Sequence, residues 1–276
     1  MRADIATRAE SNGTPGACCS SVVRVVTSAA DSVLLVGAGA LAGAVGSAGG
    51  ITSLISYPAL LAVGIRPLPA NVTNAVALVG SFAGSALGSR PELRGRGRWL
   101  ARWALLTVVG AAAGVALLLL TPDRLFGRIV PFFLVFAAIA LVLQPRISRW
   151  REVHLKQGGR FLFPCGLFAV SVYSGYFGAG SGIIVLALLL VTVEQHLAKA
   201  NALKNMLLGV ADLAAAIGFA AFGPVHWTAA APLAVGLFAG SMVGPSVTRR
   251  VPGPALRLVV ASAGIGLAIW LWVSPR

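Results

Sequence analysis

Long apolar runs recur along almost the whole chain and constrain its fold more than any other feature. Leu105 to Leu120 and Val130 to Leu143 contain no charged residue, and each is long enough to cross or enter a bilayer as a helix. Only 11% of the residues are charged, against roughly 25% in soluble domains. The runs lack the in-and-out alternation of a membrane β-barrel. We therefore expect an all-α polytopic membrane protein.

The hydropathy places ten apolar segments, some of them short. The second and the seventh fall below the roughly 20 residues that a perpendicular spanning helix needs, and each follows a glycine cluster. The first two, and the sixth with the seventh, are therefore expected to form broken helices or re-entrant hairpins, which gives about 8 to 10 transmembrane or re-entrant segments. The segments are residues 33–49, 51–65, 70–89, 100–120, 126–143, 161–179, 182–193, 201–222, 227–247 and 255–273.

The charge is strongly positive, with 22 Lys and Arg against 8 Asp and Glu. The cations collect between apolar runs, chiefly in Arg90 to Arg102, Arg146 to Arg160 and Arg249 to Arg257, as in cytoplasmic loops that follow the positive-inside rule. This placement predicts a multi-pass membrane protein with these loops in the cytoplasm and argues against a nucleic-acid partner. It puts Thr121 to Arg128, Gly223 to His226 and the N-terminus outside.

Four parts of the chain follow from these patterns. They are a flexible N-terminal tail (1–31), a first transmembrane repeat (32–145), a basic cytoplasmic linker (146–160) and a second transmembrane repeat (161–273). The three cysteines form no ligand cluster, so no metal and no cofactor is expected. The lipid bilayer is the partner that these patterns predict; a homo-oligomer is left open.

The two halves carry related sequences. GAVGSAGGI at 43–51 and GYFGAGSGI at 175–183 pair Gly43 with Gly175 and Gly50 with Gly182 at constant spacing. Some 20 residues later each half has an Ala-Asn motif, at 70–74 and 200–205. Because each half has five segments, the second copy must be inverted relative to the first. Two inverted repeats are typical of secondary transporters, whose substrate site lies near the midplane where irregular helices meet.

Glycines in membrane helices have two interpretations. Close helix packing is expected for pairs four residues apart, a pattern of small residues that lets backbones approach. These pairs are Gly39 with Gly43, Gly84 with Gly88, Gly110 with Gly114, and Gly240 with Gly244. The related sequences FAGSALG (82–88) and FAGSMVG (238–244) receive the same interpretation.

The clusters at 46–51 and 178–183 differ because each lies between two apolar segments at the same place in each half. Glycines there can unwind the backbone, and amides freed at a helix start bind anions without a buried cation. Tight packing is the alternative. The candidate substrate-binding residues of these clusters are Gly46, Ser47, Gly49, Gly50, Gly178, Gly180, Ser181 and Gly182.

Polar side chains at the starts of the third and eighth segments are the next candidates, because polar groups are costly in hydrocarbon and mark functional sites. Lys204 either contacts the substrate or extends to the cytoplasmic surface. Asp212 is a proton carrier, a counter-charge for Lys204 or a structural hydrogen-bonding group. The substrate-binding candidates here are Asn71, Thr73, Asn74, Asn201, Lys204 and Asn205.

These motifs resemble the TauE/SafE sulfite-exporter-like transporters over about residues 33 to 273. The most specific parts are GAVGSAGGITSLISYPALLAVG with PANVTNAVALVG, and YSGYFGAGSGI with KANALKNMLLGVAD. The resemblance implies an inner-membrane transporter of small sulfur-containing or carboxylated anions, without an ATP-binding part.

The predicted function is a secondary transporter, exporter or importer, of a small anion: a sulfur oxoanion, a sulfonate or a small organic acid. A proton or another cation is the expected coupling ion for this small anionic substrate. Two alternatives stay open. A non-transporting membrane scaffold would explain the glycines as packing, but not their recurrence in register. An intramembrane enzyme would need a nucleophile and a base, for which Ser181 and His196 are the best pair; we do not expect an enzyme.

Overall fold

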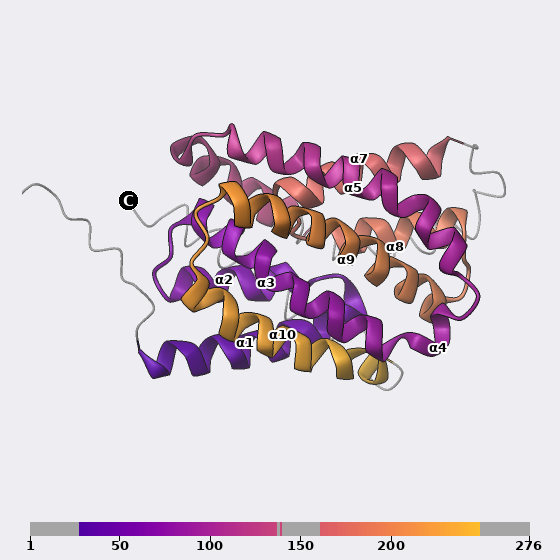
Figure 1. Ribbon diagram of the computed structural model, residues 1–276, viewed down its shortest axis with the longest axis horizontal. Helices are drawn as coiled ribbons and strands as arrows, with labels where there is room; N and C mark the ends of the chain where they lie inside the picture. The colour runs from indigo at the N-terminus through magenta and orange to yellow at the C-terminus, as the bar shows by residue number, and fades with distance from the viewer. Residues whose placement is uncertain (1–27, 137–138, 140–160, 249–276) are drawn as a thin grey trace, which may run out of the picture.

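The computed structural model describes residues 28–136, 139 and 161–248, and every regular element in these ranges is a helix (Figure 1). Residues 123–136 are helical as well. The labelled helices are α1 (Ala29–Gly49), α2 (Thr52–Ala62), α3 (Pro67–Gly88), α4 (Arg90–Leu93), α5 (Gly97–Leu119), α7 (Leu162–Tyr176), α8 (Ser181–Thr192), α9 (Leu197–Phe222) and α10 (Trp227–Thr248). The predicted all-α class is confirmed.

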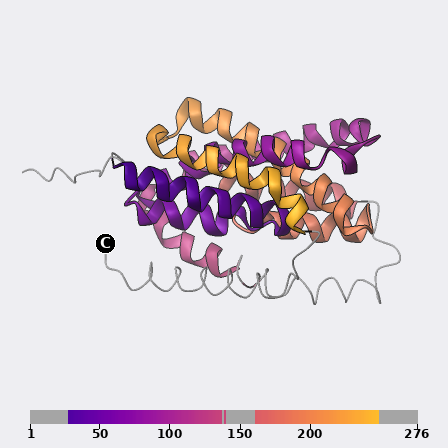
Figure 2. The same cartoon turned by 90° about the horizontal axis from the view of Figure 1, so that it is seen from below.

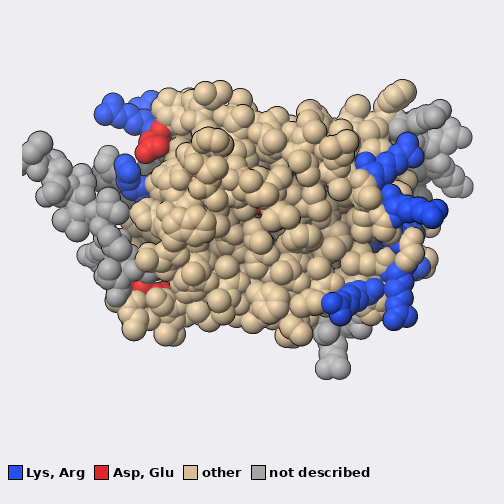
Figure 3. Space-filling model, viewed as in Figure 1, with Lys and Arg blue, Asp and Glu red and all other residues tan. Residues whose placement is uncertain are grey.

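Five of the described helices are long and apolar enough to cross a membrane: α1, α3, α5, α9 and most of α10. Figure 3 shows Lys and Arg gathered at the two ends of the molecule, Asp and Glu mainly at one of them, and a broad surface between the ends that is almost free of charge. This is the distribution of a polytopic membrane protein. The tail up to residue 27, the basic linker at 146–160 and the last apolar segment at 255–273 lie outside the described residues.

The helices match the apolar segments in place but not in their bounds. α3 begins at Pro67 and α9 at Leu197, a few residues before the predicted starts. Pro67 and Pro69 in α3 and Lys199 in α9 lower the local hydropathy. Proline nevertheless fits the first turn of a helix, because it needs no hydrogen-bonded N–H there. Asn71 and Asn201 consequently lie inside helices, where their side chains can project toward neighbouring segments.

The short helices form hairpins. α1 packs against α2, and α7 against α8. Phe163 near the start of α7 contacts Trp99 and Trp103, and Glu194 just after α8 binds Arg96. The second hairpin thus begins and ends at one end of the molecule. The first hairpin lies between the starts of α1 and α3, which share the opposite end in Figure 1.

Helices from the two halves alternate in the packing. α1 lies beside α10, as Figures 1 and 2 show, and α5 lies beside α7. α3 packs on α9 and α10, while α9 packs on α3 and α5. Exchanging the halves converts the α1–α10 contact into the α7–α5 contact. Two equivalent halves would make this set of contacts, although the inverted relation itself stays a prediction.

Glycines let these helices approach closely, as the spacing predicted. A Cβ atom on Gly43 would meet the carbonyl oxygen of Leu237, and one on Gly114 would meet that of Val172. The same holds for Gly39, Gly84 and Gly240 against backbone carbonyls of neighbouring helices. Packing is therefore confirmed for these positions.

We predict that Gly43→Ala destabilises the protein whereas Gly37→Ala does not. Both glycines lie in α1, but a Cβ on Gly37 would meet nothing within 4 Å. Forcing a methyl group into the α1–α10 contact should cost about 1 to 3 kcal/mol, whereas alanine at an open helical position gains up to about 1 kcal/mol. Thermal unfolding in detergent measures both; equal shifts would contradict the packing account.

Candidate functional site

The two glycine clusters meet at the centre of the molecule. Gly50 ends α1 in a left-handed conformation (φ 76°), and Gly178 and Gly180 precede α8 with φ of 77° and 78°. Such angles favour glycine, which has no Cβ to clash. A Cβ on Gly50 would meet the backbone of Gly182, and a Cβ on Gly182 would meet Gly50. The glycines paired in the sequence repeat are thus direct neighbours in space.

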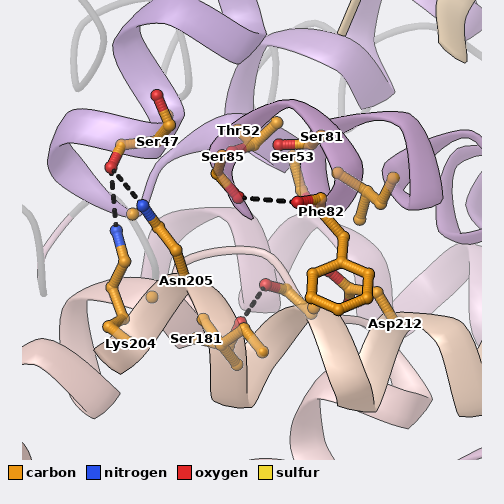
Figure 4. Close-up of a pocket in the computed structure, with 17 residues that line it drawn as sticks. Ser47, Thr52, Ser53, Ser81, Phe82, Ser85, Ser181, Lys204, Asn205 and Asp212 are labelled. Carbon is orange, nitrogen blue, oxygen red and sulfur yellow. Dashed lines mark hydrogen bonds between the residues drawn. The ribbon is translucent and has the colours of Figure 1, made fainter. Parts of the chain in front are cut away.

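A cavity of about 50 Å³ lies beside this contact. Its wall comes from the end of α1, the starts of α2 and α8, the second half of α3 and the middle of α9 (Figure 4). The predicted residues that line it are Gly46, Ser47, Gly50, Gly178, Ser181, Gly182, Lys204, Asn205 and Asp212. The predicted residues that do not line it are Gly49, Asn71, Thr73, Asn74, Gly180 and Asn201.

Three side chains of α9 converge on one backbone carbonyl. The Ser47 oxygen accepts hydrogen bonds from Asn201 Nδ2 at 2.8 Å and Asn205 Nδ2 at 3.1 Å, and from Lys204 Nζ at 3.4 Å; Figure 4 shows the last two. Ser47 lies in the last turn of α1, where carbonyls have no intrahelical partner and the helix dipole is negative. α9 of the second half therefore caps the C-terminal end of α1, at the tip of the α1–α2 hairpin of the first half.

Lys204 is a buried cation. Its relative exposure is 1%, so it does not extend to the cytoplasmic surface, the alternative left open by the sequence. It forms no ion pair with an acidic residue of the described part of the chain. The weak contact with Ser47 leaves most of the ammonium group's three donors available. An anion in the cavity would meet this ammonium group, which no acidic side chain of the described residues pairs with.

Polar side chains of α3 make comparable hydrogen bonds to neighbouring helices. Asn71 Nδ2 donates to the Tyr176 carbonyl at the end of α7, at 3.0 Å. Asn71 thus holds the second hairpin much as Asn201 holds the first. Asn74 Oδ1 accepts a 2.6 Å hydrogen bond from Ser56, and Thr73 Oγ1 accepts one from the backbone N–H of His226. These side chains hold the helices around the cavity in place.

Two helix N-termini open on the cavity, at Thr52 and Ser53 of α2 and at Ser181 and Gly182 of α8. The first N–H groups of a helix lack intrahelical partners and carry a partial positive charge. The hydroxyl of Ser181 donates to the Gly178 carbonyl at 2.8 Å, and that of Ser47 donates to Ala44 at 3.4 Å. The N–H of Ser181 already donates to the Gly178 carbonyl at 3.2 Å. The amides of Thr52, Ser53 and Gly182, together with Lys204, are therefore the donors best placed for an anion.

Asp212 lies on the cavity wall eight residues after Lys204 in α9, a separation of about 12 Å along the helix. Figure 4 shows the two side chains at opposite sides of the view. They form no ion pair, and Asp212 makes no hydrogen bond with another residue of the described ranges. Among those residues, no cluster of His, Cys, Asp and Glu could hold a metal ion.

Sequence reasoning missed several residues of the site and one ion pair. Ser81, Phe82 and Ser85 of α3 line the cavity, although FAGSALG was interpreted only as a packing motif. The four-residue spacing of Ser81 and Ser85 in an apolar helix places them on one face and was an available signal.

The sequence also showed no sign of an ion pair between Glu194 and Arg96, whose charged atoms lie 2.5 Å apart. This contact joins the α8–α9 loop to the start of α5.

The fold and the site define the class of protein: a polytopic helical membrane protein in which two hairpins meet at a small, charged central cavity. The family described as "Sulfite exporter TauE/SafE" matches residues 35–271. The chain belongs to this family of membrane transporters.

Relatives with curated names agree with that assignment. The chain is 27% identical to "Probable membrane transporter protein ORF9" of Sinorhizobium sp over 241 residues, which cover 85% of this chain and 90% of the relative. It is 26% identical to "Probable membrane transporter protein YfcA" of Escherichia coli K12 over 205 residues, or 74% and 76% of the two chains. No solved structure matches. The predicted class, a membrane transporter, is the one these names carry.

We predict that Glu194→Gln lowers the melting temperature at neutral pH and that the difference disappears in acid. Burial alone would raise the pKa of Glu194, but hydrogen bonds from His196 and the charges of Arg96 and Lys199 outweigh it and lower the pKa. A lowered carboxyl pKa stabilises the folded state above the ordinary value of about 4.3. That contribution is lost as the pH falls through the folded-state pKa.

The control is Asp123→Asn, which removes the exposed Arg66–Asp123 contact at 3.7 Å and should change the melting temperature little. A pH-independent effect of Glu194→Gln, or an equal effect of both variants, would show that the charge of Glu194 does not stabilise the fold.

Proposed function

We propose that this protein is a secondary transporter of a small anion, a sulfur oxoanion, sulfonate or small organic acid, across the plasma (inner) membrane. The observation that carries the proposal is the buried ammonium of Lys204 in the central cavity. The sulfite named in the family description supports a sulfur oxoanion as the first substrate to test.

The electrostatics of the cavity favour an anion. A cation without an acidic partner is costly in a low-dielectric interior unless a ligand or a dipole compensates it. The negative end of α1 compensates Lys204 in part through the Ser47 carbonyl. The N-termini of α2 and α8 add positive partial charge from two further directions. Around Lys204 the wall therefore combines one full positive charge with two dipoles of the same sign, while the acidic Asp212 lies eight residues further along α9.

The size of the cavity favours a small substrate. A volume of about 50 Å³ holds a few water molecules, each of which needs about 10 to 15 Å³ by the same measure. A compact oxoanion fits this space, whereas a larger organic acid requires the helices to separate. Because the hairpins enter from opposite ends, a rocking motion of one half against the other would open the cavity to each side in turn.

The competing functions have less support. In the enzyme hypothesis Ser181 and His196 would act together. His196 is an exposed side chain bound to Glu194 at the surface, whereas Ser181 is buried beside the cavity. A scaffold would leave the buried Lys204 without a role.

The experiment is transport of labelled sulfite and methanesulfonate by the full chain in lipid vesicles. We expect Lys204→Met to weaken substrate affinity roughly 10-fold to 150-fold, because a hydrogen bond to a charged group contributes about 1.5 to 3 kcal/mol. Asn205→Leu should have a smaller effect, since its amide already donates to Ser47.

Lys199→Met is the matched control, because Lys199 is an exposed lysine of the same helix. If Lys204→Met keeps its affinity while Asn205→Leu and Asn201→Leu lose theirs, the amides bind the substrate and the charge model is wrong. If wild-type protein moves neither anion, the proposed substrate class is wrong.

A further inference from the structure

The carboxyl group of Asp212 is the least explained charged group of the molecule. It lies on the wall of the central cavity, in the part of α9 that is long and apolar enough to span a membrane. It makes no hydrogen bond and no ion pair with any described residue. An ionisable side chain at such a position in a membrane helix is a candidate for an ion or proton pathway.

The charges that share the cavity with Asp212 are few. Of the described residues that line it, only Lys204 and Asp212 carry ionisable side chains. α3 and α8, which pack against α9, contain no ionisable residue, and in α7 these are Cys165, Tyr173 and Tyr176. Tyr173 donates to the Ala179 carbonyl. The remaining charges on elements packed against α9 lie toward the helix starts or in α4: Asp31, Arg90, Glu92, Arg98, Arg102 and Lys199.

The balance of charge in the cavity then links the anion to a proton. With Lys204 positive and Asp212 negative, the empty cavity is neutral overall. A monoanion bound at Lys204 leaves one net negative charge in a low-dielectric space, where like charges repel strongly. One proton on the Asp212 carboxylate restores neutrality. Each ligand therefore favours binding of the other, and this coupling is reciprocal.

We propose that Asp212 binds one proton from the aqueous side to which the cavity is open whenever Lys204 binds a monoanion, and that the protein moves the two together as an anion–proton cotransporter. The inference rests on the proposed function and adds its coupling ion. The carboxylate accepts the proton before the movement and returns it to water on the other side, so that no bond to the substrate forms and no charge accumulates in the cavity.

The experiment measures binding of methanesulfonate to the purified full chain by calorimetry, between pH 5 and 8 and in buffers of different ionisation enthalpy. Methanesulfonate is the anion of a strong acid, so it takes up no proton itself. Wherever Asp212 is ionised in the free protein, we expect uptake of one proton per anion and affinity that rises about tenfold for each unit that the pH falls.

Asp212→Asn imitates the protonated carboxyl group. It should bind methanesulfonate without proton uptake and with affinity that does not depend on pH. In vesicles it should exchange the anion without acidifying the interior, whereas wild-type influx acidifies it. Asp123→Asn, which alters an exposed carboxylate, should behave as wild type. Asp212→Ser serves as a second variant if Asp212→Asn does not fold.

Two results would overturn the inference while leaving anion transport intact. One is wild-type affinity that does not change with pH. The other is proton uptake that persists in Asp212→Asn, because the proton would then go to Lys204. Wild-type protein that binds neither methanesulfonate nor sulfite at any pH would overturn the proposed function itself, and the coupling with it.

Discussion

The contact between Gly50 and Gly182 is the constraint on which the centre of this structure depends. Backbone touches backbone there, so the tips of both hairpins come closer than any side chain would allow. Four helix ends consequently gather in a small volume: α1 with its carbonyls, the end of α7, and α2 and α8 with their amide groups. The cavity beside the contact takes its polarity from these ends rather than from many charged side chains.

α9 makes this arrangement specific. Asn201 and Asn205 satisfy the Ser47 carbonyl at the tip of the first hairpin, while Asn71 of α3 satisfies the Tyr176 carbonyl at the end of α7. Carbonyls left without partners at this depth would be costly. Each half therefore completes the hydrogen bonding of the other. The same contacts hold Lys204 at the cavity, so the groups that stabilise the tips also place the charge that we propose for the substrate.

The sequence predicted the class of fold because hydropathy follows directly from the solvent that a helix must face. It also predicted which glycines pack, since Gly43 and Gly114 follow the four-residue spacing of a helix surface. It could not decide between broken helices and hairpins, because that choice depends on the φ angles of Gly50, Gly178 and Gly180. Nor could it show that Asn201 and Asn205 donate to a carbonyl 154 and 158 residues away. Such pairings depend on tertiary contacts, and the role of each residue in substrate binding remains a prediction.

The most direct measurement is a crystal structure of the protein with selenite, a heavier analogue of sulfite, located by the anomalous scattering of selenium. The account predicts one strong selenium peak in the central cavity, within hydrogen-bond distance of Lys204 Nζ and facing the starts of α2 and α8. The peak should be lost in Lys204→Met crystals. Selenium bound away from the cavity, or an unchanged peak in Lys204→Met, would contradict the claim that the hairpin tips and Lys204 form the anion site.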